Sequence, residues 1–137
     1  MMLDFSSLEK ACKTFELAIK VYAKNTLLEN NPEKLLLRDG IIQRFEFTYE
    51  LSWKMLKRYL EEYGLEKADT LNNRELFRIG WEQGLISEPE KWFHYMKMRN
   101  QTSHVYDEKK AVEVYTTALK FLPDAKYLLA KLKEKAK

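Results

Sequence analysis

Apolar residues recur along most of the chain at intervals of three and four, which is the spacing of amphipathic helices that pack against other helices. The first such run predicts a helix that starts near Asp4. Its apolar seam comprises Phe5, Leu8, Cys12, Phe15, Ile19 and Tyr22. Because Cys12 falls inside this seam, we expect a buried and unreactive thiol. Asn31 and Pro32 interrupt the pattern and are typical of an N-cap and of the first residue of a new helix.

The second predicted helix, from about Pro32 to Tyr63, is the longest element, at about 45 Å for a rise of about 1.5 Å per residue. Its apolar residues are too many for a single stripe. They are Leu36, Leu37, Ile41, Ile42, Phe45, Phe47, Tyr49, Leu51, Trp53, Leu56, Tyr59 and Leu60. A central position in a bundle would cover both apolar faces, and so would a dimer interface along one of them. Gly64 suits a left-handed helix end, with Leu65 placed to contact Leu60.

Capping signals predict two further helices in the middle of the chain. Asn72 and Glu75 form a capping-box pattern ahead of a short third helix, which should end at about Gln83, before Gly84. Ser87 is expected to cap the fourth helix, which carries Trp92 and Met96 as core residues and continues into the segment 99–106.

The final predicted helix starts near Asp107, a good N-cap, and keeps its apolar register to Leu132. Pro123 lies inside it. A proline removes one backbone hydrogen bond and crowds the preceding turn, so we expect a kink or a restart near residues 120–123.

Composition agrees with an all-α fold in one domain that spans residues 1–137. Hydrophobic residues make up 45% and charged residues 33%, with four glycines and three prolines, which favours long helices over a turn-rich sheet. A single cysteine excludes an internal disulfide. No leader precedes the first helix and no apolar run approaches the roughly 20 residues that cross a bilayer, so we expect a cytoplasmic protein without a membrane span. The net charge of +3 is too small to indicate nucleic-acid binding by itself.

The segment 97–107 is polar and aromatic where its neighbours are apolar stripes. Within eight residues it brings together a fixed cation, an amide, an imidazole and a phenol, supplied by Arg99, Asn100, His104 and Tyr106. Arg99 and His104 are about 140° apart on an ideal helix, so they converge best if the helix loosens after Asn100.

Two interpretations of this segment stay open from spacing alone. Arg99 would bind a phosphate bidentately while neutral His104 accepts a proton from a ribose 2′-hydroxyl, which needs no metal and leaves a cyclic phosphate. Alternatively, both are surface pairing or capping groups at a helix end. His94 has no supporting neighbours and is interpreted as structural, and the chain offers no zinc-site pattern.

A polar strip runs along the second predicted helix, through Arg44, Glu46, Glu50, Lys54 and Arg58. It is either a solvated face with i,i+4 pairing or a support for the polar segment. In the second case Glu46 or Glu50 orients the arginine or the histidine.

Three parts of the sequence together resemble the nucleotidyltransferase substrate-binding family, a branch of the HEPN superfamily of small helical bundles. They are the segment Arg38–Lys54 (RDGIIQRFEFTYELSWK), Gly84–Ile86 with Trp92, and the segment Arg99–Glu108 (RNQTSHVYDE). The resemblance covers about residues 5–130, and two separate motifs agree in order and spacing.

The resemblance implies an up-and-down bundle of four to five helices that forms a homodimer and pairs with a separately encoded minimal nucleotidyltransferase, in many cases as toxin and antitoxin. The R-x4-H-x-Y pattern of HEPN ribonucleases falls on Arg99, His104 and Tyr106, and Asn100 matches its R-N opening. In those toxins the partner silences the site by adding adenylate to the tyrosine.

Two functions therefore compete, and no cofactor or metal is expected for either. The leading one is a binding module that offers Arg99, His104 and Tyr106 to the nucleotidyltransferase, with RNA or a nucleotide as a possible further ligand. The alternative is a metal-independent RNA endonuclease with His104 as general base, Arg99 on the phosphate, Asn100 positioning and Tyr106 as the modified residue. Glu46, Glu50 and Asp107 are the expected supporting residues. A helical interaction protein with a merely structural polar segment is the remaining interpretation.

Overall fold

The computed structural model describes residues 3–63 and 68–136, and every regular element in these ranges is helical. The elements are α1 (Ser6–Lys24), α2 (Pro32–Glu62), the 3-10 turn η1 (Ala68–Thr70), α3 (Asn73–Glu82), α4 (Pro89–Asn100), the 3-10 turn η2 (Gln101–His104) and α5 (Glu108–Lys135). The predicted all-α fold is confirmed.

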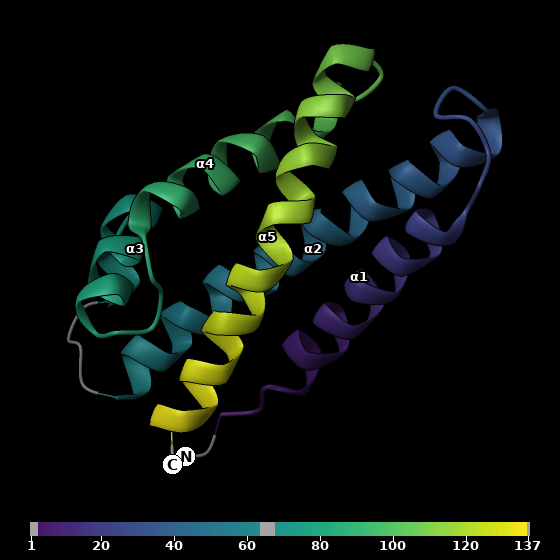
Figure 1. Cartoon of the computed structure of the whole chain (residues 1–137). Coiled ribbons are helices and arrows are strands. Elements are labelled where there is room, and N and C mark those ends of the chain that lie inside the picture. Colours follow the sequence, from purple (N-terminus) through teal and green to yellow (C-terminus); the bar gives the residue numbers. More distant parts are fainter. Residues whose placement is uncertain (1–2, 64–67, 137) are drawn as a thin grey trace.

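The helices form an up-and-down bundle in which α2 is central. Figure 1 shows α1 and α2 side by side, with α5 crossing α2 and the α3–α4 pair on the other side of it, and α2 makes contacts with all four of the other helices. The turn between α4 and α5 lies at the opposite end of the bundle from the ends of the described chain. The neighbouring helices thus cover most of the two apolar faces of α2, as a central position in the bundle predicts.

An aromatic cluster fills the centre of the bundle. The fully buried ring of Phe121 in α5 meets Phe45, Trp92 and Tyr95 edge-on at centroid distances of 5.3, 5.4 and 4.9 Å. Such edge-to-face pairs add to the energy of apolar burial. Trp92 is a core residue as predicted, and Met96 packs partly buried against the same core.

Local capping signals set most helix boundaries. The Asn31 side chain accepts from the Glu33 N–H at 2.9 Å, and Asn72 and Glu75 form the predicted capping box at the start of α3. Gly84 follows α3 with a φ of 75°, a left-handed conformation that favours glycine. The predicted ending at Gly64 and Leu65 lies outside the described residues.

Two boundary predictions are wrong, and one of two alternatives is excluded at a third position. The cap of α4 is Glu88 and not Ser87, because Pro89 takes the favoured first helical position and restricts the preceding residue to an extended conformation, here φ −144° and ψ 112°. The fourth helix ends at Asn100 and does not continue through residue 106. Of the kink or restart expected near residues 120–123, the restart does not occur, because α5 runs unbroken through Pro123. Pro123 is exposed, so water can satisfy the carbonyl group that loses its partner.

No helix in the described part of the chain combines the length and the apolar character needed to cross a bilayer.

Candidate functional site

Two carboxylates of α2 hold Arg99, which lies in the last turn of α4. Its Nη1 is 3.3 Å from Glu46 Oε2, and its Nε is 3.1 Å from Glu50 Oε1. Glu46 and Glu50 are four residues apart and therefore share one face of α2. The sequence left open which glutamate reaches the polar segment, and the structure places both beside Arg99.

Thr102 completes this cluster, and sequence reasoning missed it. Its hydroxyl donates to Glu46 Oε2 at 2.7 Å and accepts from Arg99 Nη1 at 3.3 Å. The same hydroxyl lies 2.8 Å from the Arg99 carbonyl oxygen, three residues earlier. A threonine three residues after the arginine at a helix end was the available signal, because local side-chain-to-backbone bonds of this kind are common there.

The charges of the Arg99 cluster bear directly on phosphate binding. Two carboxylates surround one guanidinium, so the cluster carries a net negative charge when all three groups are ionised. The Arg99 side chain is 30% exposed, and two of its three nitrogen atoms lie near glutamate oxygen atoms, although Nε makes no hydrogen bond among the described residues. A phosphate that contacts Arg99 therefore also meets two neighbouring carboxylates, whose charges oppose its approach.

His104 and Tyr106 lie on the turn that follows. The α-helix ends at Asn100, where a change was expected, but the chain tightens into the 3-10 turn Gln101–His104 and does not loosen. The rings of His104 and Tyr106 meet edge-on with centroids 6.2 Å apart. Tyr106 is 86% exposed, the largest value among the exposed large hydrophobic residues, and His104 and Asn100 are also exposed. The turn therefore displays an imidazole and a phenol to solvent.

The predicted site thus divides into two parts. Arg99 lies beside Glu46 and Glu50, whereas the His104 ring contacts the Tyr106 ring. Within the described ranges no hydrogen bond joins the Arg99 guanidinium to the His104 ring.

The first turn of α5 fixes the other end of this segment. The Asp107 side chain accepts from the Lys109 N–H at 2.9 Å, so it is the predicted N-cap. Glu108 receives two hydrogen bonds from Arg38 of α2, Nη1 to Oε2 at 2.7 Å and Nη2 to Oε1 at 2.9 Å. These bonds lower the pKa of the Glu108 carboxyl group.

His94 lies apart from these groups. Its Nε2 is 3.1 Å from the hydroxyl of the buried Thr117, which joins α4 to α5. This contact agrees with the structural role expected for His94.

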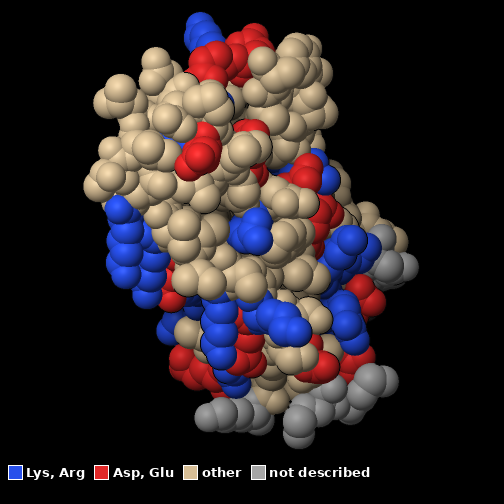
Figure 2. Space-filling model, turned by 90° about the vertical axis from the view of Figure 1, so that its right-hand side faces the viewer, with Lys and Arg blue, Asp and Glu red and all other residues tan. Residues whose placement is uncertain are grey.

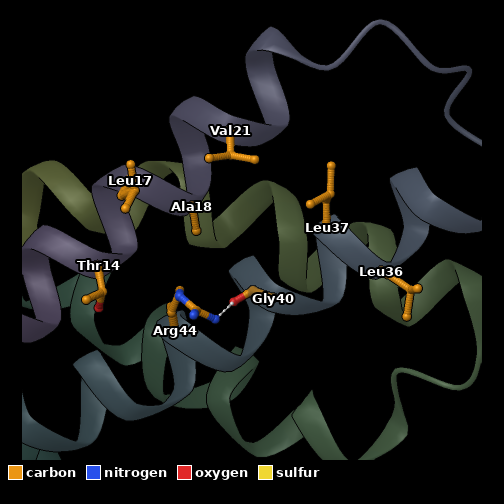
Figure 3. Close-up of a pocket in the computed structure, with 8 residues that line it drawn as sticks. All are labelled: Thr14, Leu17, Ala18, Val21, Leu36, Leu37, Gly40 and Arg44. Carbon is orange, nitrogen blue, oxygen red and sulfur yellow. Dashed lines mark hydrogen bonds between the residues drawn. The ribbon is translucent and has the colours of Figure 1, made fainter.

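The side of the bundle formed by α1 and α2 carries few charges over much of its area. Figure 2 shows this side, where uncharged residues predominate in the upper part around some acidic groups, and where basic and acidic residues are mixed lower down. A hollow of about 300 Å³ lies between the two helices. Figure 3 shows its lining, which includes Leu17 and Val21 from α1 and Leu36 from α2. Arg44 also lines it but turns back to donate to the Gly40 carbonyl at 3.1 Å.

Comparison with known protein families decides the family of this chain. The family model described as "Nucleotidyltransferase substrate binding protein like" matches residues 3–134. The chain belongs to this family.

Several known proteins are similar to this chain in sequence or structure. A Haemophilus influenzae protein named "Probable ribonuclease HepT" is 41% identical over 98 residues, which cover 70% of this chain and 67% of that protein. A solved Haemophilus influenzae structure, described as revealing the fold of a substrate binding domain of a nucleotidyltransferase, superposes with a TM-score of 0.87 at 34% identity over 95% of this chain and 99% of that one. A solved structure from Thermus thermophilus gives a TM-score of 0.69 at 30% identity, over 91% of this chain and 98% of that one.

Proposed function

We propose that this chain is the binding partner of a separately encoded minimal nucleotidyltransferase and that it presents the turn with His104 and Tyr106 to that enzyme, as one half of a toxin–antitoxin pair. The observation that carries the proposal is Tyr106, whose phenol is 86% exposed on a short turn that is tied to α2 on both sides. An exposed side chain on a firmly held segment can enter the active site of another protein at a low cost in conformational entropy.

The chemistry proposed for Tyr106 is transfer of a nucleotidyl group. The phenol oxygen attacks the α-phosphorus of a nucleoside triphosphate, pyrophosphate leaves, and a base of the partner takes the phenol proton. The partner also supplies the metal ions that neutralise the phosphates. This chain supplies the acceptor oxygen and its placement.

Co-expression with the neighbouring nucleotidyltransferase tests the complex. We expect the two proteins to co-purify. Tyr106→Glu, which replaces the neutral phenol by a carboxylate, should weaken the complex at least tenfold. Tyr127→Glu is the matched control, because Tyr127 is also exposed but lies on the C-terminal half of α5. Failure of the wild-type proteins to associate, or equal weakening by both substitutions, would contradict the proposal.

A second function, a metal-independent RNA endonuclease, is favoured by two observations. One relative carries the name "Probable ribonuclease HepT", and His104 is exposed and close to Tyr106. In this reaction neutral His104 takes the proton of a ribose 2′-hydroxyl, the 2′ oxygen attacks the phosphorus, and the 5′ oxygen leaves to give a 2′,3′-cyclic phosphate. Arg99 would stabilise the developing charge, and Asn100 would position the strand.

Incubation of the purified protein with mixed RNA in EDTA tests the endonuclease. We expect cleavage by the wild type and by His94→Ala, and its loss in His104→Ala. Cleavage that survives in His104→Ala would contradict the assignment of the general base.

We also propose that the chain forms a homodimer through the face of α1 and α2 that surrounds the hollow between these helices. The support is the exposure of Leu17 and Leu36, at 61% and 69%, on both sides of the hollow in Figure 3. An exposed apolar face of this kind commonly marks a protein interface.

A further inference from the structure

Two arginine contacts hold the His104–Tyr106 turn, one at each end. Before the turn, Arg99 of α4 is held by Glu46 and Glu50 of α2. After the turn, Glu108 of α5 is held by Arg38 of α2. Arg38 and Glu46 are eight residues apart on the same helix, about 12 Å along its axis. One rigid helix therefore holds both ends of the exposed turn.

The pair of Arg38 and Glu108 is unequal in burial. The Arg38 side chain is 10% exposed, whereas the Glu108 side chain is 68% exposed. The buried arginine is the fixed member, held near the N-terminal end of α2. Its contact fixes the position of the exposed Glu108, which lies two residues after Tyr106. The two parallel hydrogen bonds fix orientation as well as distance.

Burial of Arg38 contributes little to net stability. Its Nε is buried and has no hydrogen-bond partner among the described residues. A buried guanidinium with an unsatisfied donor carries a desolvation cost, and apolar residues of similar volume are often as stable or more stable in such places. Gain in stability is therefore a poor explanation for an arginine here, and control of position is a better one.

We propose that Arg38 is a positioning residue which, through Glu108, fixes the first turn of α5 and so holds His104 and Tyr106 in the geometry that the partner enzyme meets. This inference rests on the proposed function of the turn. Arg38 itself touches no reacting atom. Its effect passes along the backbone from Glu108 and the adjacent N-cap, Asp107, to the exposed phenol.

Replacement of Arg38 by methionine tests the anchor. Methionine has a similar length and is apolar, and the freed Glu108 can be hydrated because it is already exposed. We expect the fold to persist while the backbone amides of residues 101–108 exchange hydrogen at least tenfold faster. Arg38→Lys, which can reach one carboxylate oxygen at a time, should give an intermediate rate.

Lys34→Met is the matched control. Lys34 is a buried cation one turn earlier on α2, and its Nζ donates to the carbonyl oxygens of Tyr22 and Asn25 at 2.9 and 2.6 Å. Its loss should affect the end of α1 and leave exchange in residues 101–108 unchanged. If Arg38→Met does not fold, Glu108→Ala breaks the same contact from the exposed side and should give the same faster exchange.

Nucleotidylation of Tyr106 by the partner provides the functional measurement. We expect the rate constant for modification to fall at least tenfold in Arg38→Met, to recover partly in Arg38→Lys and to stay at the wild-type level in Lys34→Met. Unchanged exchange in residues 101–108, or faster exchange with an unchanged modification rate, would overturn the positioning role. A wild-type protein that is not modified would refute the proposed function, while the exchange experiment would still decide whether Arg38 holds the turn.

Discussion

Tyr106 and Glu108 are two residues apart and differ completely in what surrounds them. The Tyr106 ring meets His104 and is otherwise open to solvent, whereas the Glu108 carboxylate is fixed by two hydrogen bonds from Arg38. Tyr106, which we propose as the reacting residue, therefore lies two positions before the residue that we propose to fix its place. This division explains how an exposed phenol can have a defined position.

The pKa of Glu108 gives a prediction about pH. Arg38 lowers this pKa below the ordinary value of 4.5, so the contact stabilises the folded state above that value and is lost as the pH falls through the folded-state pKa. We expect the wild type to melt at a higher temperature than Glu108→Gln at about pH 7. The difference should vanish at a pH below the pKa of Glu108 in both the folded and the unfolded state, because glutamine imitates the protonated acid. Thermal unfolding followed by circular dichroism measures this. A difference that does not shrink in acid would contradict the ion pair.

The thiol of Cys12 gives a second prediction at this scale. Burial raises its pKa to about 11, so the reactive thiolate is scarce near neutral pH. We expect the native protein to resist a thiol reagent at about pH 8 for hours and the denatured protein to react at once. Rapid stoichiometric labelling of the folded protein would show that this part of the core opens readily.

At the residue scale, sequence reasoning predicts which residues could carry chemistry, but it does not predict their contacts. Arg99, His104 and Tyr106 stand out because their residue types differ from the surrounding apolar stripes. The contacts of Thr102 and Arg38 depend on how α2 packs against α4 and α5, over 56 and 70 residues of sequence. No local spacing encodes such contacts.

At the scale of elements, prediction succeeded where the signal is local. Asn31 and Asn72 cap their helices through bonds to backbone groups two and three residues away. The predicted cap at Ser87 failed because the preference of Pro89 for the first helical position outweighed the preference of serine for the cap. The end of α4 at Asn100 could not be predicted firmly. The weak helix propensity of Gln101–Ser103 permits a break there but does not require one.

Pro123 provides a test of how α5 tolerates an internal proline. The helix is continuous through it, so Pro123→Ala should restore one backbone hydrogen bond and relieve crowding in the preceding turn. We expect the free energy of unfolding to rise by about 2 kcal/mol, less than the full cost of an internal proline because alanine also frees the unfolded chain. Chemical denaturation measures the change. A loss of stability would mean that the proline packs usefully where it lies.

At the scale of the whole molecule, the central position of α2 accounts for most of its apolar residues, and the face shared with α1 remains uncovered. We expect light scattering at micromolar concentration to give twice the 16.4 kDa chain mass and Leu36→Glu to give the single mass. Trp81→Glu, on the exposed side of α3, is the control and should leave the dimer intact. A wild-type mass near 16.4 kDa would contradict the proposed interface.

The same helix also connects the two proposals about function. Through Glu46, Glu50 and Arg38 it holds both ends of the exposed turn, and through Leu36 it contributes to the uncovered face. Dimerisation and presentation of Tyr106 would therefore depend on one rigid element.

The central claim is that Tyr106 is presented to a nucleotidyltransferase, and the most direct test is the intact mass of the protein after incubation with the neighbouring enzyme, Mg²⁺ and ATP. The wild type should gain the mass of adenylyl groups, Tyr106→Phe should gain none, and the exposed control Tyr127→Phe should behave as the wild type. No added mass on the wild type in a stable complex, or equal labelling of Tyr106→Phe, would contradict the account.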